Sequence, residues 1–127
     1  MKTKTAFAPV LNLPKGTKEA GFYSKAFGGI EEWCLRNDDD SIHVAQFNIG
    51  GAIFHVHELM PGSGDILPQG GVTTVIGLFV DDVHAVFDKA VAAGARAITP
   101  VTDHEYGWRQ GELEDAFGHR WVIQKIL

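Results

Sequence analysis

Two histidines, His55 and His57, stand one residue apart in a stretch where apolar and polar residues alternate. Side chains two positions apart leave the same face of a β-strand, so both imidazoles are expected on one face. That spacing can chelate a metal ion, but zinc and iron sites use at least three protein ligands. Glu58 is expected on the opposite face. The pattern therefore favours histidines that serve as hydrogen-bond donors or bases near neutral pH, and a metal held by His55 and His57 is the alternative.

Arg109 is a second candidate for ligand binding. If four residues form the turn between the last two predicted strands, Arg109 pairs with Gln124 and shares a face with Val122. A guanidinium there would suit a carboxylate or a phosphate, bound through two parallel hydrogen bonds. An ion pair with Glu112 or Glu114 is an equally good reading of the same residue. The ligand is therefore expected to be a small organic molecule, anionic if Arg109 contacts it.

A hairpin is predicted to position the histidines. Gly50 and Gly51 separate two alternating runs, 41–49 and 52–58, which is a strong signal for a two-residue turn. That turn length sets the register of the two strands. It pairs Ile49 with Ala52, Phe47 with Phe54, Gln46 with His55, and Val44 with His57. One face of the hairpin is then apolar, and the opposite face, polar enough to line a cavity, carries Gln46, His55 and His57.

The other elements repeat one pattern twice. Before the hairpin we expect a strand at 6–13, a helix at 17–27 capped by Thr17, and an edge strand at 30–35. After a glycine-rich loop at 59–71 we expect a strand at 72–80, a helix capped by Asp81 or Asp82, a strand at 95–100, and strands at 106–114 and 121–127. A shift of about 65 residues lays Phe22 on Phe87 and Gly29 on Gly94. The prediction is an α+β fold of two βαβββ modules, 6–58 and 72–127, forming a curved mixed sheet around a cleft in a single domain, 1–127.

Composition narrows the function classes. The chain has 127 residues, a net charge of −5 and one cysteine. No Lys/Arg cluster appears, so nucleic acid is not expected as a partner. No apolar run approaches the roughly 20 residues that cross a bilayer, so no membrane partner is expected. A single cysteine excludes an intrachain disulfide and fits a cytoplasmic protein.

Several motifs together resemble the vicinal oxygen chelate superfamily, which includes glyoxalases, bleomycin-resistance proteins and extradiol dioxygenases, and within it the PhnB-like branch. They occur in the family's order along nearly the whole chain. An alanine, Ala116, replaces the proline that usually follows the turn aspartate. The motifs are FYSKAFGG at 22–29, FVDDV at 79–83, AAGA at 92–95, YGWR at 106–109 and DAFGHRW at 115–121.

The resemblance implies paired βαβββ modules that often assemble as homodimers. It also implies a divalent metal in the enzymes of the family, with ligands from the first, fourth, fifth and eighth strands. The matching positions are Ala8 or Pro9, His55, Val75 and Val122, of which only His55 can bind a metal. We therefore expect no dedicated metal and no other cofactor. Whether the modules pair within one chain or swap between chains is left open.

The function expected from these arguments is binding of a small organic ligand in the cleft between the modules. A metal-dependent lyase, isomerase or dioxygenase of the same superfamily is the alternative, and a dimeric module without a ligand is a third reading, so the sequence does not decide whether the protein is an enzyme. Trp108 either walls the cleft or packs in the core or a dimer contact. The predicted ligand-binding residues are Gln46, His55, His57, Phe79, Trp108, Arg109 and Gln124.

Overall fold

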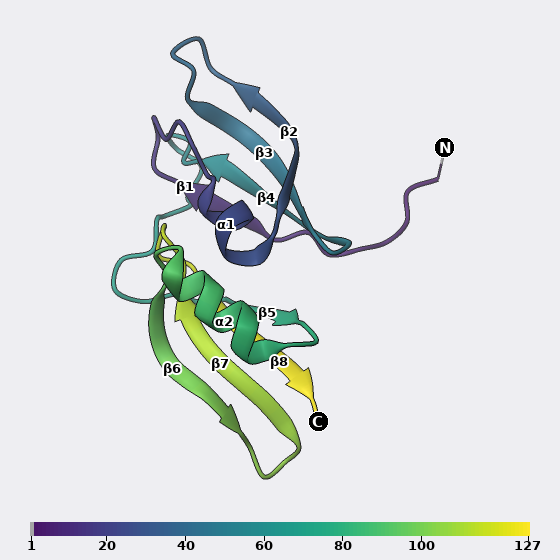
Figure 1. The fold of residues 1–127 in the computed structure, drawn as a ribbon. Coiled ribbons are helices and arrows are strands. Elements are labelled where there is room, and N and C mark those ends of the chain that lie inside the picture. Colours follow the sequence, from purple (N-terminus) through teal and green to yellow (C-terminus); the bar gives the residue numbers. More distant parts are fainter. Residues whose placement is uncertain (1) are drawn as a thin grey trace. The chain divides into compact units, whose positions relative to one another are not determined.

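The computed structural model describes residues 2–127, which form two compact units (Figure 1). The first unit comprises the chain up to Glu19 together with Ile30–Ile66, and the second comprises Ala20–Gly29 and Leu67–Leu127. The first unit contains the strands β1 (Val10–Leu13), β2 (Ile30–Arg36), β3 (Ile42–Ile49) and β4 (Ala52–Glu58). The second contains the helices α1 (Phe22–Phe27) and α2 (Val83–Ala92) and the strands β5 (Val75–Phe79), β6 (Arg96–Asp103), β7 (Trp108–Glu114) and β8 (Arg120–Ile126).

The two sheets have the same topology. The first runs β1-β4-β3-β2 and the second β5-β8-β7-β6. In each, the first strand of the module pairs in parallel with the last, while the other neighbours are antiparallel. The 65-residue shift carries the parallel pair Val10 and His55 onto Val75 and Arg120. The predicted α+β fold of two repeated modules with mixed sheets is confirmed.

The hairpin β3–β4 has the predicted register. Gln46 pairs with His55 and Val44 with His57, around the turn at Gly50 and Gly51. Both glycines have positive φ, 56° and 98°, which explains why glycine occupies both turn positions. β2 lies at the edge of this sheet, as predicted.

Helix α1 is shorter than predicted. It begins at Phe22, after Gly21, which offers no side-chain cap. The predicted cap Thr17 instead donates its hydroxyl to the carbonyl of Pro14 at 2.6 Å. Thr17 is therefore part of the turn that follows β1, because a threonine hydroxyl can satisfy a nearby carbonyl as readily as a helix terminus. Asp82 does cap α2, accepting a 3.0 Å hydrogen bond from the amide of Ala85.

The register of β7 and β8 differs from the prediction by one residue. Glu114 pairs with Arg120, so five residues form the connection where four were expected. The carboxylate of Asp115 accounts for the extra residue, since its Oδ1 accepts hydrogen bonds from the amides of Phe117 and His119. Gly118, with φ of 93°, completes this turn.

This register decides which face of the second sheet is core. Leu113 pairs with Trp121 and Gly111 with Ile123, and these residues are buried. Helix α2 lies across that face (Figure 1), and a Cβ on Gly111 would come within 2.8 Å of the ring of Phe87. Glycine at 111 thus lets the helix approach the sheet closely. The opposite face, with Val122 and Gln124, is turned away from α2.

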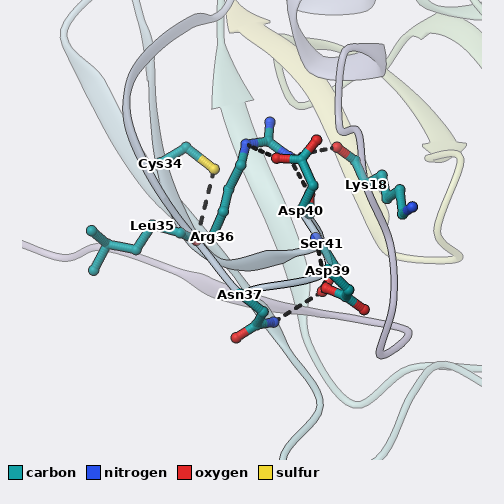
Figure 2. A network of polar contacts seen from close by, with 8 residues as sticks. All are labelled: Lys18, Cys34, Leu35, Arg36, Asn37, Asp39, Asp40 and Ser41. Carbon is teal, nitrogen blue, oxygen red and sulfur yellow. Dashed lines mark hydrogen bonds and ion pairs between the residues drawn. The ribbon is translucent and has the colours of Figure 1, made fainter.

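The segment 37–40, between β2 and β3, contains three aspartates and forms a turn that is held by hydrogen bonds (Figure 2). Arg36 donates to the carbonyls of Lys18 and Asp40, at 2.9 and 2.8 Å. Asp39 accepts from both the hydroxyl and the amide of Ser41, and these bonds lower the pKa of the Asp39 carboxyl. Asp39 thus stabilises the turn itself.

Neither helix within residues 2–127 is long and apolar enough to cross a membrane.

Candidate functional site

Each unit presents one sheet face that carries predicted ligand-binding residues. In the first unit this face has a row of four neighbours, Val10, His55, Gln46 and Trp33, one from each strand. The next row is Asn12, His57, Val44 and Leu35. Directly paired residues point to the same side of a sheet, so all eight share it. We call this surface the histidine face.

His55 is held by a chain of hydrogen bonds. The carboxylate of Glu32 can only accept hydrogen bonds, so the Gln46 group that donates to it at 3.1 Å is the amide nitrogen. The Gln46 oxygen is thereby turned to Nε2 of His55, 2.9 Å away, and Nε2 must carry the proton. In the neutral form of the ring, the lone pair is then on Nδ1. The ring of Trp33 lies 5.8 Å from that of His55.

His57 is oriented by the backbone. Its Nδ1 lies 2.7 Å from the carbonyl of Glu58, which can only accept, so Nδ1 is protonated and Nε2 holds the lone pair. Its ring also lies 4.8 Å from the ring of His43. The predicted common face of His55 and His57 and the predicted pairing of Gln46 with His55 are confirmed, and each neutral histidine offers one accepting nitrogen.

The second unit presents a face organised in three rows across β5, β8, β7 and β6. We call it the amide face. The first row is Phe79, Gln124, Gln110 and Thr102; the second is Gly77, Val122, Glu112 and Thr99; the third is Val75, Arg120, Glu114 and Arg96. Trp108, paired with Ile126, stands beside the first row. The face is thus aromatic and amide-rich at one end and ionic at the other, with Gly77 and Val122 between them on β5 and β8.

The first row combines aromatic rings with amides. The rings of Phe79 and Trp108 are 5.5 Å apart and inclined at 52°, and Phe79 is 57% exposed. Gln110 donates to Gln124 at 2.8 Å, and the hydroxyl of Tyr106 donates to Gln110 at 2.9 Å. A shallow hollow of about 120 Å³ beside this row is lined by Thr99, His104, Gln110, Gly111, Glu112 and Val122.

The charges of the third row are balanced together with Glu112 of the second row. Arg96 bonds Glu114 at 2.8 Å. Arg120 lies 3.6 Å from Glu112 and 3.9 Å from Glu114, and its side chain is 19% exposed. Two arginines and two glutamates leave no net charge on this end of the face.

Arg109 is not on the amide face, which corrects the sequence-based placement. It pairs with Lys125 and points to the opposite side of the sheet from Gln124. There it makes a two-pronged ion pair with Asp103, with N–O distances of 2.6 and 3.0 Å. The turn at Asp115, longer than predicted by one residue, causes this change of face. A shift of the register by one residue moves every side chain of a strand to the other face of the sheet. Gln110 takes the place beside Gln124 that was assigned to Arg109.

A sequence profile of the glyoxalase/bleomycin resistance protein/dioxygenase superfamily matches residues 11–123. The chain belongs to this superfamily. An uncharacterised protein of Mycobacterium bovis is 31% identical over 128 residues, covering 97% of this chain and 84% of that protein. A counterpart from Mycobacterium tuberculosis shows the same identity and coverage of this chain, and 75% of its own length.

Several solved structures share the fold. A gene product of Arabidopsis thaliana is 27% identical, covers 97% of this chain and 100% of its own, and superimposes with a TM-score of 0.74. A glyoxalase-related enzyme from Fulvimarina pelagi, at 18% identity, covers 96% and 88% with a TM-score of 0.72. The fosfomycin resistance protein FosX from Listeria monocytogenes, also at 18%, covers 97% and 93% with a TM-score of 0.70. These last two show a common fold alone.

The residues present do not fit the divalent metal that the superfamily implies. Val75 and Val122 occupy two of the implied ligand positions, and an aliphatic side chain has no donor atom for a metal. The register places Val10 beside His55 and Gly77 beside Val122, which supply no donor atom, while Glu112, on the other side of Val122, is in an ion pair with Arg120. Within residues 2–127, no three His, Cys, Asp or Glu side chains are grouped so as to hold an ion. The donor groups of this chain therefore do not match the metal centre of the superfamily's enzymes.

Sequence reasoning missed three residues of these faces, Trp33, Tyr106 and Gln110. Trp33 lies in a strand whose pairing with β3 shifts between Glu31 and Trp33, so simple alternation did not reveal its face. Gln110 was hidden by the register error. Tyr106 was expected within the last-but-one strand but lies in the loop before β7, which begins at Trp108.

Proposed function

We propose that the protein binds a small organic ligand on the amide face and does so without a dedicated metal. The exposed ring of Phe79 beside Trp108, next to the Gln110–Gln124 amide pair, carries this proposal. Large aromatic side chains left exposed beside fixed polar groups are characteristic of ligand sites, because burial of the rings drives binding while the polar groups orient the ligand. We also propose that the chain is a member of the PhnB-like branch, on the motifs at 22–29, 106–109 and 115–121.

The amide face favours an uncharged ligand group over an anion. The anionic expectation rested on Arg109, whose guanidinium is already engaged by Asp103 on the other side of the sheet. The two arginines of the amide face are matched by Glu112 and Glu114. The histidine face of the first unit, with His55, His57 and Gln46, is a second surface able to accept hydrogen bonds from a ligand.

A panel of aromatic antibiotics, organic acids and phosphonates, measured by thermal shift, tests the binding proposal. A ligand that binds the folded state raises the melting temperature by mass action. The shift should disappear in Phe79→Ala and Trp108→Ala and persist in Phe7→Ala, which removes an aromatic ring that is 98% exposed in the first unit. Shifts that survive both amide-face substitutions would contradict the proposed site.

A metal-dependent enzyme is the second candidate, favoured by His55 and His57 on one face. Elemental analysis of protein purified without a histidine tag separates the two functions. The binding proposal expects far less than one zinc, manganese or iron ion per chain. About one tightly held ion per chain, lost in His55→Ala but retained in His84→Ala, would overturn the proposal in favour of the enzyme.

The homodimer implied by the family is a further proposal. Sedimentation equilibrium on the untagged chain measures its mass directly, and a mass of one chain at all concentrations would refute it.

A further inference from the structure

The side-chain amide of Gln124 is oriented by a directed chain of hydrogen bonds. Tyr106 donates its hydroxyl proton to the oxygen of Gln110, and the Gln110 nitrogen donates to the oxygen of Gln124. The Gln124 nitrogen is the end of this chain. Within residues 2–127 it donates to no protein atom. The chain of bonds therefore fixes a donor, and not an acceptor, at this point of the amide face.

Gly77 provides the space in which this donor lies. A Cβ on residue 77 would come within 2.6 Å of Nε2 of Gln124, so the amide occupies the volume that any other side chain would fill. Gln124 is only 8% exposed. The amide nitrogen itself still reaches solvent, and a ligand that supplies an acceptor there can take the place of water.

The surroundings of the donor indicate what kind of ligand it recognises. Phe79 pairs directly with Gln124, and its ring meets that of Trp108, so flat apolar surface adjoins the nitrogen. The amide row carries no formal charge, and the arginines two rows away are matched by glutamates. Such surroundings suit a planar, uncharged group.

We propose that Gln124 determines the specificity of this face by donating to an uncharged oxygen, the carbonyl of a ketone, amide or lactam, on an aromatic ligand that lies against Phe79 and Trp108. This inference rests on the proposed binding function and deepens it. It assigns Gly77, Gln110 and Tyr106 as positioning residues, which act on the ligand only through the Gln124 amide.

The orientation of the amide is tested without any ligand. In ¹⁵N-labelled protein, the side-chain NH₂ protons of Gln124 should show nuclear Overhauser contacts to the α-protons of Gly77. Gly77→Ala should displace the amide and shift both resonances, whereas Gly71→Ala, whose added methyl meets open space, should leave them unchanged. Absence of the contact in the wild-type protein would overturn the inference.

Specificity is tested with three probes of similar size, benzamide, benzamidine and toluene, by ligand-observed NMR. Benzamide presents a carbonyl oxygen, benzamidinium has the same shape with donors only, and toluene offers the ring alone. The wild-type protein should bind benzamide about tenfold more tightly than the other two, the ratio expected for one additional hydrogen bond. Gln124→Leu should reduce that ratio to about one.

Gln124→Glu is the sharper variant. A carboxylate can still accept from Gln110 but offers an acceptor to the ligand, so the preference should reverse in favour of benzamidinium. Equal binding of all three probes by the wild-type protein would overturn the inference while leaving the binding function intact. Binding of none of them would overturn both.

Discussion

The phenol of Tyr23 donates a 2.6 Å hydrogen bond to Oδ2 of Asp115, joining residues 92 positions apart in the chain. The same oxygen accepts from the indole nitrogen of Trp121 at 3.0 Å. The other carboxylate oxygen accepts from two amides of the turn between β7 and β8. Asp115 is buried, so this one carboxylate ties helix α1, the turn and strand β8 together.

Tyr23→Phe should lower the free energy of unfolding by about 1–3 kcal/mol, because it removes a donor from a buried carboxylate. Urea denaturation of the purified variant measures the change. Tyr106→Phe, which removes an exposed tyrosine hydroxyl, is the matched control and should change stability by less than about 0.5 kcal/mol. Equal effects of the two substitutions would contradict the role given to Asp115.

Tyr23 also predicts how stability depends on alkaline pH. Burial, reinforced by the charge of Asp115 and by their hydrogen bond, raises the pKa of Tyr23 well above its ordinary value of 10.0. The unfolded state therefore loses the phenol proton first, so this contribution is complete below pH of about 10 and falls as pH rises above it. The alkaline decline in melting temperature should be shallower in Tyr23→Phe than in the wild-type protein. An unchanged slope would show that the phenol titrates normally.

Gly111→Ala should destabilise the second unit by about 1–3 kcal/mol. The new methyl would lie within 2.9 Å of two ring atoms of Phe87 and 2.8 Å from a methyl of Val101. Helix α2 would have to move away from the sheet to relieve the contact. Thermal denaturation against Gly71→Ala, where the methyl has open space, isolates this effect from the general change of glycine to alanine. If both variants melt alike, α2 does not pack closely against Gly111.

Arg109→Ala should leave binding at the amide face unchanged and should change the pKa of the Asp103 carboxyl instead. The hydrogen bond from Arg109 lowers the pKa of the Asp103 carboxyl, so its removal should return that pKa toward its ordinary value. Because the folded-state pKa is depressed, the ion pair contributes stability above the unfolded pKa, and the contribution is lost as pH falls through the folded value. An NMR titration of the Asp103 carboxyl checks the shift. Loss of ligand binding in this variant would show that Arg109 does belong to the binding site.

Gln46→Leu should release the imidazole of His55. The substitution removes the acceptor for Nε2 and should cost about 0.5–1.5 kcal/mol of stability, the usual worth of one hydrogen bond. Long-range ¹H–¹⁵N spectra of the ring should show a proton held on Nε2 in the wild-type protein and a mixture of tautomers in the variant. Glu32→Gln is the companion variant, since it lets the Gln46 amide turn over without removing it. A mixture of tautomers in the wild-type protein would refute the hydrogen-bond chain.

Much of the architecture could be predicted because its signals are local. Two glycines between two alternating runs indicate a two-residue turn, and this turn length correctly predicted that Gln46 pairs with His55. Helix α2 follows Asp81 and Asp82, the two predicted caps, and Asp82 makes the capping hydrogen bond. The repeat of the two modules followed from the order of such elements.

The sequence by itself thus determined the fold class, the common face of His55 and His57, and the absence of donor atoms at Val75 and Val122. Only the tertiary structure decided which residues share the second face. A buried carboxylate at Asp115, satisfied by Tyr23 from a distant helix, lengthens the last turn by one residue. Because side chains alternate along a strand, that single residue turns Arg109 toward Asp103 and brings Gln110 to Gln124. Contacts between residues so far apart in the chain leave no periodic signal, so no pattern in the sequence could have set this register.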